Sequence, residues 1–410
     1  MRRSLLLITP LAAASALLAF KQSPAPACDP DNGGLTLPKG FCATVYASLP
    51  GVRHVQVAPN GDVFASGARG GVTALRDRKG SGHADTTATF GGSTGTGIAL
   101  GTDAIYYAPN DRVIRFAWKP GSLTPSDTGT VIVSGLPATG NHSVKTLALS
   151  KDGASIFVDH GSASNICLGR GQGVKAQGPT PCPELPTRAG TWRYDTRKPN
   201  QSLADGERWT TGVRNGMALA IEPTTGVLWG ATHGRDDLRG ALDFSDQDNA
   251  EKPAEEFGIF AKGADYGWPY CYFDPIAKKK VLGPEYGGDG VKAGECAGKT
   301  QPVIGFPGHW APLALNFVPA KNSFGAEYAS GAFLAFHGSW NRAPLPQAGF
   351  RVVFIPFKDG KATGTWSTFA DGSATQIKIS GVAMAPDGSA LFIASDGVGK
   401  IWRVVPTTSR

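Results

Sequence analysis

The sequence has few charged side chains and little helical patterning. Asp, Glu, Lys and Arg together make up only 18% of its 410 residues, whereas hydrophobic residues make up 41%. Disordered chains and coiled coils carry more charge, so both classes are excluded. Beyond an apolar run near the N-terminus, no segment of useful length has apolar residues at the helical period. The 55 glycines and 30 prolines follow no collagen-like period and indicate many short strands joined by turns.

Cysteine is also scarce, and no Cys-x-x-Cys pair of the kind that zinc sites use is present. The six cysteines fall into three close pairs: Cys28 and Cys42, Cys167 and Cys182, Cys271 and Cys296. An even number in an exported chain indicates disulfides, and sequential pairing is the simplest of about fifteen connectivities. Lipidation of Cys28 is the alternative, but it would leave Cys42 without a partner.

The N-terminus has the charge order of a signal peptide. Arg2 and Arg3 precede an apolar run from Leu5 to Phe20, which is short for a stable membrane span. We therefore expect residues 1–27 to be a signal peptide and linker, and residues 28–410 to form one domain. The expected location is the periplasm or the exterior of a bacterium.

The formal net charge is +7, but the basic residues are scattered. The one basic run, Lys278–Lys280, is short and typical of a solvated loop. Nucleic acid is therefore not expected as a partner, whereas a small anionic cofactor is compatible with this charge.

One pattern occurs six times: an apolar alternating strand, a turn often built from Pro, Asp, Asn and Gly, and a second apolar strand. The copies are Val55–Phe64, Gly97–Tyr106, Leu147–Ile156, Leu219–Leu228, Leu315–Ala335 with a longer insert, and Val382–Leu391. Period-2 alternation around Asp-Gly or Asn-Gly turns marks β-hairpins, which must stack or close into a ring to bury their apolar faces. Further strands follow several copies, as at 113–116, 351–355 and 400–404.

Four strands in each of six blades fit the length, so the sequence predicts an all-β, six-bladed β-propeller of four-stranded antiparallel blades. Long loops are expected around residues 160–190 and 235–310. A β-sandwich is the alternative fold, and six similar hairpins disfavour it.

The candidate site residues lie next to the predicted strands. His142 precedes the third hairpin, and His233 and His337 follow strands, so each can face a central channel. Arg214 and Asn215 precede the fourth hairpin, and a guanidinium beside an amide suits a planar, oxygen-rich anion. The segment from His233 to Leu238 combines glycine with Asp236 and Asp237, which is a weak calcium signal. Gly91–Gly97 lacks the ending of a phosphate loop, and no nucleophile elbow for esterase chemistry is present.

Several of these segments resemble the soluble quinoprotein glucose/sorbosone dehydrogenase family, in particular its sorbosone dehydrogenase-like branch. The segments are Gly212–Gly216, His233–Leu238, Asp265–Tyr272 (Asp-Tyr-Gly-Trp-Pro-Tyr-Cys-Tyr), Ala311–Phe317, His337–Arg342 (His-Gly-Ser-Trp-Asn-Arg) and Pro386–Arg403. The resemblance runs from about residue 35 to 405. It implies a six-bladed propeller that binds pyrroloquinoline quinone (PQQ) and calcium and oxidises an aldose or a sugar-derived aldehyde.

The resemblance also implies roles for individual residues. His142 would be the general base and Arg214 would stabilise charge on the quinone. The carbonyls of Gly234 and Arg235 would bind calcium. The cofactor-binding residues would be Arg69, Arg214, Asn215, His337, Trp340, Arg342 and Lys378.

The sequence departs from the family pattern at a few positions. Lys378 stands where an Arg is common, which keeps the charge but loses the bidentate geometry. Lys145 replaces an Arg expected after the base, and Ser395–Asp396 replaces a pair of aspartates. These changes leave a non-catalytic binding or scaffold propeller of the cell envelope as the alternative, while lactone hydrolysis would need more carboxylates. An external electron acceptor is required, and no haem-attachment motif identifies it.

Overall fold

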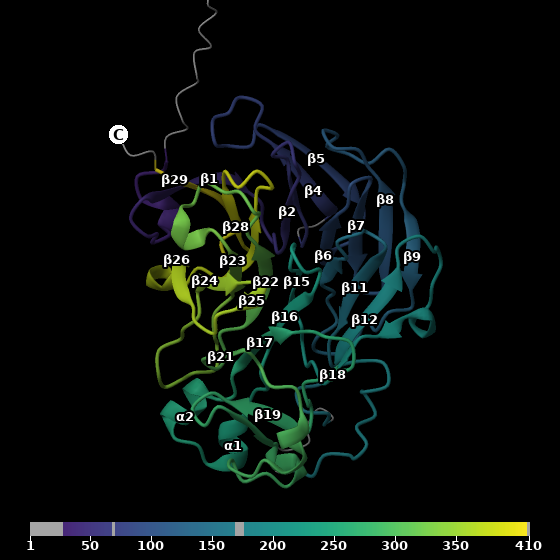
Figure 1. Ribbon diagram of the computed structural model, residues 1–410, viewed down its shortest axis with the longest axis vertical. Helices are drawn as coiled ribbons and strands as arrows, with labels where there is room; N and C mark the ends of the chain where they lie inside the picture. Colours follow the sequence, from purple (N-terminus) through teal and green to yellow (C-terminus); the bar gives the residue numbers. More distant parts are fainter. Residues whose placement is uncertain (1–27, 68–69, 169–175, 408–410) are drawn as a thin grey trace, which may run out of the picture.

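The computed structural model describes residues 28–67, 70–168 and 176–407, and these form a six-bladed β-propeller. The expected signal peptide and Arg69 lie outside the described residues. Each blade is an antiparallel sheet whose first strand is nearest the central axis. Figure 1 shows innermost strands such as β2, β6, β15 and β22 near the middle of the ring.

The first three blades follow the chain. Blade 1 contains β2 (Val55–Val57), β3 (Val63–Ala65), β4 (Gly71–Arg76) and β5 (Thr86–Gly91). Blade 2 contains β6 (Gly95–Leu100), β7 (Ala104–Pro109), β8 (Arg112–Ala117) and β9 (Thr130–Ser134). Blade 3 contains β10 (Leu147–Leu149), β11 (Ser155–His160), β12 (Gly190–Asp195) and β13 (Glu207–Arg208).

The other three blades complete the ring. Blade 4 contains β15 (Ala218–Ile221), β16 (Leu228–Thr232), β17 (Glu255–Ile259) and β21 (Ile304–Phe306). Blade 5 contains β22 (Pro312–Phe317), β23 (Gly331–Phe336), β24 (Arg351–Lys358) and β26 (Ser367–Asp371), and β25 (Lys361–Ala362) pairs with the end of β24. Blade 6 contains β27 (Ile379–Met384), β28 (Leu391–Ser395), β29 (Lys400–Pro406) and β1 (Phe41–Ser48).

The six predicted hairpins are confirmed, because each forms the two innermost strands of one blade. The segments predicted to follow them are β8, β24 and β29, the third strands of their blades. The paired apolar strands and the turns between them therefore identify the blades correctly. Strands such as β7, β11 and β23 are buried along their whole length, because they pack between two neighbouring blades.

The ring is closed by the N-terminal strand. β1 pairs antiparallel with β29, from Phe41 opposite Pro406 to Ser48 opposite Lys400, and becomes the outermost strand of blade 6. The innermost strands contact one another in the order β2, β6, β10, β15, β22, β27 and back to β2. The backbone of Asp29 and the side chains of Asp29 and Asn32 bond to β1, which satisfies polar groups along this edge strand.

The hydrophobic core is divided among the blade interfaces. One buried cluster lies between each pair of neighbouring blades, including the pair formed by blades 6 and 1. Between blades 5 and 6, for example, Phe333 and Phe354 pack in the same cluster as Trp402. Opening the ring at one interface would expose the apolar faces of the two blades that meet there, so closure stabilises the whole domain.

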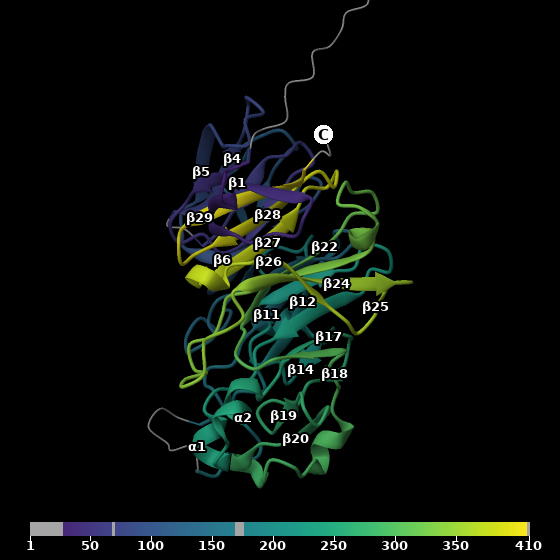
Figure 2. The same cartoon turned by 90° about the vertical axis from the view of Figure 1, so that its left-hand side faces the viewer.

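A layer of insertions lies at one end of the ring and was foreseen only as loops. It contains α1 (Leu238–Leu242), α2 (Asp246–Glu251), β19 (Cys271–Asp274), β20 (Lys279–Leu282), η3 (Pro284–Tyr286) and η4 (Gly294–Gly298). The parallel pair β14 (Thr210–Thr211) and β18 (Ala264–Asp265) connects it to the blades. Both views place α1, α2 and β19 together beyond the blades (Figures 1 and 2). The two helices are too short to give a periodic signal in the sequence.

Four further short 3₁₀ helices lie in loops: η1 (Asn32–Gly34), η2 (Leu203–Asp205), η5 (Ala326–Tyr328) and η6 (Ser373–Thr375). Among the described residues, no helix has both the length and the apolar character needed to cross a membrane.

The cysteines pair sequentially, as predicted: Cys28–Cys42, Cys167–Cys182 and Cys271–Cys296. Because the sulfur of Cys28 is bonded to Cys42, the structure favours the disulfide over lipidation at this residue. Three disulfides are typical of a protein that folds in an oxidising compartment.

The first disulfide supports ring closure, because it ties residue 28 to the strand that completes blade 6. Replacing both Cys28 and Cys42 by Ser is expected to lower the free energy of unfolding by about 2–4 kcal/mol, since the unfolded chain is no longer constrained. Urea denaturation of the variant and of the native chain measures this difference. A change smaller than about 0.5 kcal/mol would show that β1 is held by strand pairing alone.

Candidate active site

The polar residues at one end of the ring lie just before the first strand or just after the second strand of the inner hairpins. The innermost strands begin at this end, and the second strands of the blades finish there. Residues just before β15 and β27 therefore meet residues just after β11, β16, β23 and β28. This arrangement brings together His142, Arg214, Asn215, His233 and His337, which are far apart in the sequence.

Three innermost strands begin with a register shift: β6 between Gly95 and Gly97, β22 between Pro312 and Ala314, and β27 between Ile379 and Gly381. Such bulges commonly redirect groups beside functional sites. The carbonyl of Leu313, inside the bulge of β22, accepts a hydrogen bond from Nε2 of His54 at 3.0 Å. Because His54 precedes β2 of blade 1, this bond braces blades that are not neighbours in the ring.

His142 is held by one nitrogen. Its Nδ1 lies 3.0 Å from the carbonyl oxygen of Ser162 and 2.9 Å from Ser162 Oγ, and that hydroxyl itself donates to the Ser164 carbonyl. A carbonyl can only accept, so Nδ1 carries the proton and Nε2 keeps its lone pair. Burial, the positive charge of Arg214 and the neighbouring His233 lower the pKa of His142 well below its ordinary value. His142 is therefore a neutral imidazole whose basic nitrogen is Nε2.

Arg214 is buried and its guanidinium is surrounded by acceptors. Nε donates to the Asn165 carbonyl at 3.1 Å, and Nη2 donates to Asn165 Oδ1 at 2.9 Å and to Asp236 Oδ2 at 2.8 Å. Nη1 donates to the carbonyl of Gly234 at 2.8 Å. The other oxygen of Asp236 accepts from Nδ2 of Asn341 at 2.8 Å, which fixes this carboxylate between two donors.

Asn215 and His233 form a second buried pair. His233 Nε2 donates to the carbonyl of Pro312 at 2.8 Å, so its Nδ1 is the acceptor for Nδ2 of Asn215 at 3.4 Å. Burial lowers the pKa of His233 to about 4, despite the bond to Pro312. The buried Oδ1 of Asn215 has no hydrogen-bond partner within the described part of the chain. An unpaired buried acceptor of this kind marks a place where a ligand or water can bond.

A more exposed group lies across the ring. His337 Nε2 bonds to Asp396 Oδ1 at 2.8 Å, and Arg53 Nη1 bonds to Asp396 Oδ2 at 3.0 Å. Burial raises the pKa of Asp396, but the bond from His337 and the charges of Arg53 and Lys378 outweigh it, and the pKa lies below its ordinary value. Lys378 is exposed to solvent. His337 also influences His233 electrostatically, which connects the two sides of the site.

Gly234 and Arg235 link the ring to the insertion layer. The amide of Gly234 donates to Glu255 Oε2 at 2.9 Å, and burial raises the pKa of Glu255 to about 8. The side chain of Arg235 forms a buried bidentate pair with Glu285 and is turned away from the solvent. The guanidinium of Arg235 is therefore engaged by Glu285 and not directed to a ligand. In the described segments, no three His, Cys, Asp or Glu side chains gather as a metal site.

Two of the predicted cofactor contacts, Trp340 and Arg342, have distinct surroundings. Trp340 is 73% exposed, so an aromatic face is open to a ligand. Arg342 is buried, and its guanidinium bonds to the carbonyls of Ala250, Gly308 and Pro346 and to Glu251. These contacts hold the loop in place, so the expectation that Arg342 faces a cofactor is not supported by its geometry.

The replacement at Lys145 has a structural explanation. Its side chain is fully buried, donates to the carbonyls of Pro137 and Ser143, and interacts with the charge of Asp159. Burial lowers the pKa of Lys145 and raises that of Asp159, and the attraction between the two charges opposes both shifts. A Cβ on Gly216 would lie 2.7 Å from Asp159 Oδ1, so the turn carrying Arg214 and Asn215 needs glycine here.

The sequence reasoning missed several residues of this site. They are Arg53, His54, Ser162, Asn165, Glu255 and Asn341. Only Asn341 lay inside a recognised motif. Asn165 belongs to a long loop without periodic pattern, so its contacts with Arg214 and Asp236 could not be foreseen.

Comparison with known proteins supports this description. A family model described as TrAA12-like matches residues 35–407. A PQQ-dependent sugar dehydrogenase of Hypocrea jecorina is 25% identical over 272 residues, which are 59% of this chain and 57% of the relative. A PQQ-dependent pyranose dehydrogenase of Coprinopsis cinerea is 29% identical over 129 residues, which are 26% of this chain and 16% of the relative. The chain thus matches only part of the length of these relatives, 57% of the first and 16% of the second.

Solved structures show the same fold. The Trichoderma reesei protein of carbohydrate-active enzyme family AA12, in an iodide structure, superposes with a TM-score of 0.75 at 20% identity and covers 91% of this chain and 98% of its own. The PQQ domain of Coprinopsis cinerea pyranose dehydrogenase, in its holo form, has a TM-score of 0.71 at 18% identity and covers 93% and 98%. The predicted fold and the predicted resemblance are both confirmed.

The Arg235–Glu285 pair is expected to stabilise the insertion layer. Glu285→Gln leaves a buried guanidinium without its counter-charge, so the free energy of unfolding should fall by about 3–5 kcal/mol. Urea denaturation measures the loss. Glu207→Gln is the control: it breaks partly exposed pairs with Arg193 and Lys262 and should cost less than about 1 kcal/mol. Equal losses in the two variants would contradict the anchoring role of Glu285.

Proposed function

The chain belongs to the TrAA12-like family, and on this basis we propose that it is a PQQ- and calcium-dependent oxidoreductase. Its proposed substrate is an aldose sugar or a sugar-derived aldehyde, oxidised by hydride transfer to the quinone. Two relatives of this chain are a PQQ-dependent sugar dehydrogenase and a PQQ-dependent pyranose dehydrogenase, and they support this reaction class. An external carrier must then remove the electrons.

The observation that carries the proposal is the pairing of a neutral base with a buried cation. Nε2 of His142 keeps its lone pair because Nδ1 bonds to Ser162, and the positive charge of Arg214 lowers the pKa of this histidine. A base in this state can take the hydroxyl proton of a sugar when hydride leaves the same carbon. Arg214 would stabilise an oxygen that gains negative charge nearby.

The side chains around the site fit an anionic, oxygen-rich cofactor. Arg214 and Asn215 line one side, and His337, Lys378 and the unpredicted Arg53 lie on the other. Bound PQQ would supply the acceptor for the hydride. Asn215 and His337 would orient it, Lys378 would pair with an acidic group, and Trp340 would cover an exposed face. We retain Arg69 as a further expected contact and leave Arg342 out of the set.

Calcium is proposed to accompany the cofactor. Calcium accepts hard oxygen donors, including backbone carbonyls, and the proposed donors are the carbonyls of Gly234 and Arg235. The Gly234 carbonyl also accepts from Nη1 of Arg214 at 2.8 Å, so calcium would have to share or displace this bond. Asp236 is already bonded to Arg214 and Asn341, so the protein would supply few further ligands. The remaining oxygens would have to come from the cofactor and from water.

The proposed location is extracytoplasmic. Three disulfides in the folded chain support it, together with the charge order of residues 1–27. A small sugar can diffuse to such a site.

Cofactor binding is the first test of this function. Calorimetric titration of the purified chain with PQQ should show tight binding that requires calcium, and Arg214→Ala should weaken it by at least about tenfold, which is the loss of roughly 1.4 kcal/mol. Arg115→Ala, which removes a cation of β8 paired with Asp103, is the matched control. Absence of binding with and without calcium would contradict the proposal and favour a non-catalytic scaffold.

The role of His142 is tested by kinetics with sugars and an artificial dye acceptor. His142→Ala should reduce kcat by about 10²–10⁴-fold while PQQ still binds. Because the pKa of His142 is lowered, the base is already neutral in mildly acid solution, and the acid limb of the rate profile should lie well below pH 6.5. A limb near pH 6.5, or an unchanged kcat in the variant, would show that another group is the base.

A further inference from the structure

A short segment after β11 contacts both proposed catalytic side chains. Ser162 bonds to Nδ1 of His142, and Asn165, three residues later, bonds to Arg214. Neither residue belongs to a motif of the sequence. The segment Ser162–Asn165 is therefore in a position to determine how the base and the guanidinium lie relative to each other.

The hydrogen bonds of Arg214 show how strongly it is held. Its guanidinium has five N–H groups, and four of them are used in the bonds to Asn165, Asp236 and Gly234. Asn165 receives two of these four. The remaining N–H is on Nη1, so the network leaves one defined direction in which Arg214 can bond to a ligand.

Asn165 is itself fixed in one orientation. Its Oδ1 accepts from Arg214 Nη2 and from the amide of Asp236 at 2.9 Å, and its Nδ2 donates to the carbonyl of Asp236 at 3.0 Å. A flipped amide would place donor against donor and acceptor against acceptor. Its carbonyl accepts from Arg214 Nε and from Nε1 of Trp268 at 2.8 Å. One residue thus joins blade 3 to Arg214, to the loop after β16 and to the insertion layer.

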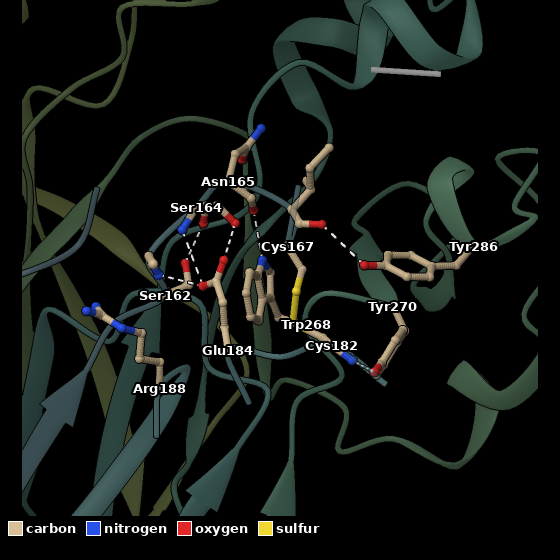
Figure 3. Close-up of a disulfide and its surroundings, with 12 residues drawn as sticks. Ser162, Ser164, Asn165, Cys167, Cys182, Glu184, Arg188, Trp268, Tyr270 and Tyr286 are labelled. Atoms are coloured by element: carbon tan, nitrogen blue, oxygen red, sulfur yellow. Dashed lines mark hydrogen bonds between the residues drawn. A yellow bond between two sulfur atoms is a disulfide. The ribbon is translucent and has the colours of Figure 1, made fainter. Parts of the chain in front are cut away.

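The base is held through a similar chain of contacts. Ser162 Oγ donates to the carbonyl of Ser164 at 2.6 Å. Glu184 accepts from the amides of Ala163 and Ser164 and from the Ser164 hydroxyl. Figure 3 shows Ser162, Ser164 and Glu184 joined in this way. The carboxylate of Glu184 therefore fixes the turn that presents Ser162 to His142.

The Cys167–Cys182 disulfide lies within the connection from β11 to β12, and these groups flank it on either side. Asn165 lies two residues before one cysteine, and Glu184 lies two residues after the other. Tyr270 accepts from the amide of Cys182, and Tyr286 donates to the carbonyl of Ile166. Figure 3 shows both tyrosines and Trp268 around the sulfur bridge. The disulfide thus holds the two ends of the loop beside each other.

We propose that Ser162–Asn165, held by Glu184 and the Cys167–Cys182 disulfide, is the positioning element of this site. Asn165 places Arg214, and Ser162 fixes the proton of His142 on Nδ1. The inference rests on the proposed function for the meaning of these positions. Neither residue is catalytic, because both act through another side chain.

The consequence for function is that the lone pair of His142 and the free N–H of Arg214 each point in one defined direction. With Nδ1 bonded to Ser162, the lone pair of His142 is on Nε2 only, and with Asn165 in place Arg214 keeps a single rotamer. Small displacements of such groups cost about 10²-fold in rate. Loss of the Asn165 side-chain amide removes one of the four bonds of Arg214, the one from Nη2 to Oδ1, and leaves the bonds to Gly234, Asp236 and the Asn165 carbonyl. The guanidinium can then shift from its position.

A double-mutant cycle tests whether Asn165 acts through Arg214. Asn165→Ala is expected to weaken PQQ binding, measured by calorimetry with calcium, by about 10–100-fold. In an Arg214→Ala background, the same change should have an effect below about twofold, because the group that it positions is absent. An equal loss in both backgrounds would overturn the inference, since a merely structural role adds independently.

A second readout does not need the cofactor. The ring protons of His142, followed by NMR against pH in the free protein, report the nearby charge of Arg214. Asn165→Ala should move the His142 titration towards its ordinary range, and should not move it when Arg214 is already Ala. If the native chain does not bind PQQ, the proposed function fails while this cycle still decides the positioning. An unchanged titration in Asn165→Ala overturns the positioning inference.

The disulfide is tested against a matched partner. Replacing Cys167 and Cys182 by Ser should weaken PQQ binding and move the His142 titration in the same direction as Asn165→Ala. Replacing Cys28 and Cys42 by Ser removes a disulfide at β1 of blade 6, outside the contacts that hold Ser162–Asn165, and should change binding by less than about twofold. Similar effects of the two pairs would refute a specific role for Cys167–Cys182.

Discussion

The pairing of β1 with β29 is the constraint on which the rest of the structure depends. A blade has two apolar faces, and each can be buried only against another blade. An open array would leave two such faces in water, whereas the closed ring buries six interfaces. Closure by a strand from the opposite end of the chain also makes folding cooperative, because blade 6 is complete only when both ends are present.

Closure of the ring also explains why the functional groups meet. Every innermost strand begins at the same end of the ring, so the residues that precede it are gathered around one axis. Apolar residues dominate within the strands, and polar residues follow as soon as the strands end. Arg214, His233 and His337 come from blades 4 and 5, and their mutual approach follows from this common direction. The bulge at the start of β22 contains Leu313, whose carbonyl accepts a hydrogen bond from His54 of blade 1 across the ring.

The two sides of the site differ in how their charges are held. Arg214 is buried, and a buried guanidinium is tolerated only with enough acceptors, which Asn165, Gly234 and Asp236 provide. Lys378 is exposed and Arg53 is only partly covered, so these cations retain solvent and flexibility. One side is thus rigid and suited to chemistry, and the other is suited to receiving the acidic groups of a ligand.

Much of this organisation could be predicted from the sequence. The alternation in Val55–Phe64 and its five counterparts determined the hairpins, because a strand's two faces are set by period 2 alone. The cysteine spacing suggested the disulfides, and the positions of His142, Arg214 and Asn215 beside strands pointed to the site. Asn165, Glu184 and Arg53 could not be found in this way, since loops follow no period. Likewise the sequence placed Arg342 beside a cofactor and read Lys145 as a replacement for an Arg, and only packing showed that both side chains are buried against carbonyls. Local pattern determines which face a strand buries, whereas the partner of a long polar side chain depends on which distant segments the closed ring brings within hydrogen-bonding distance.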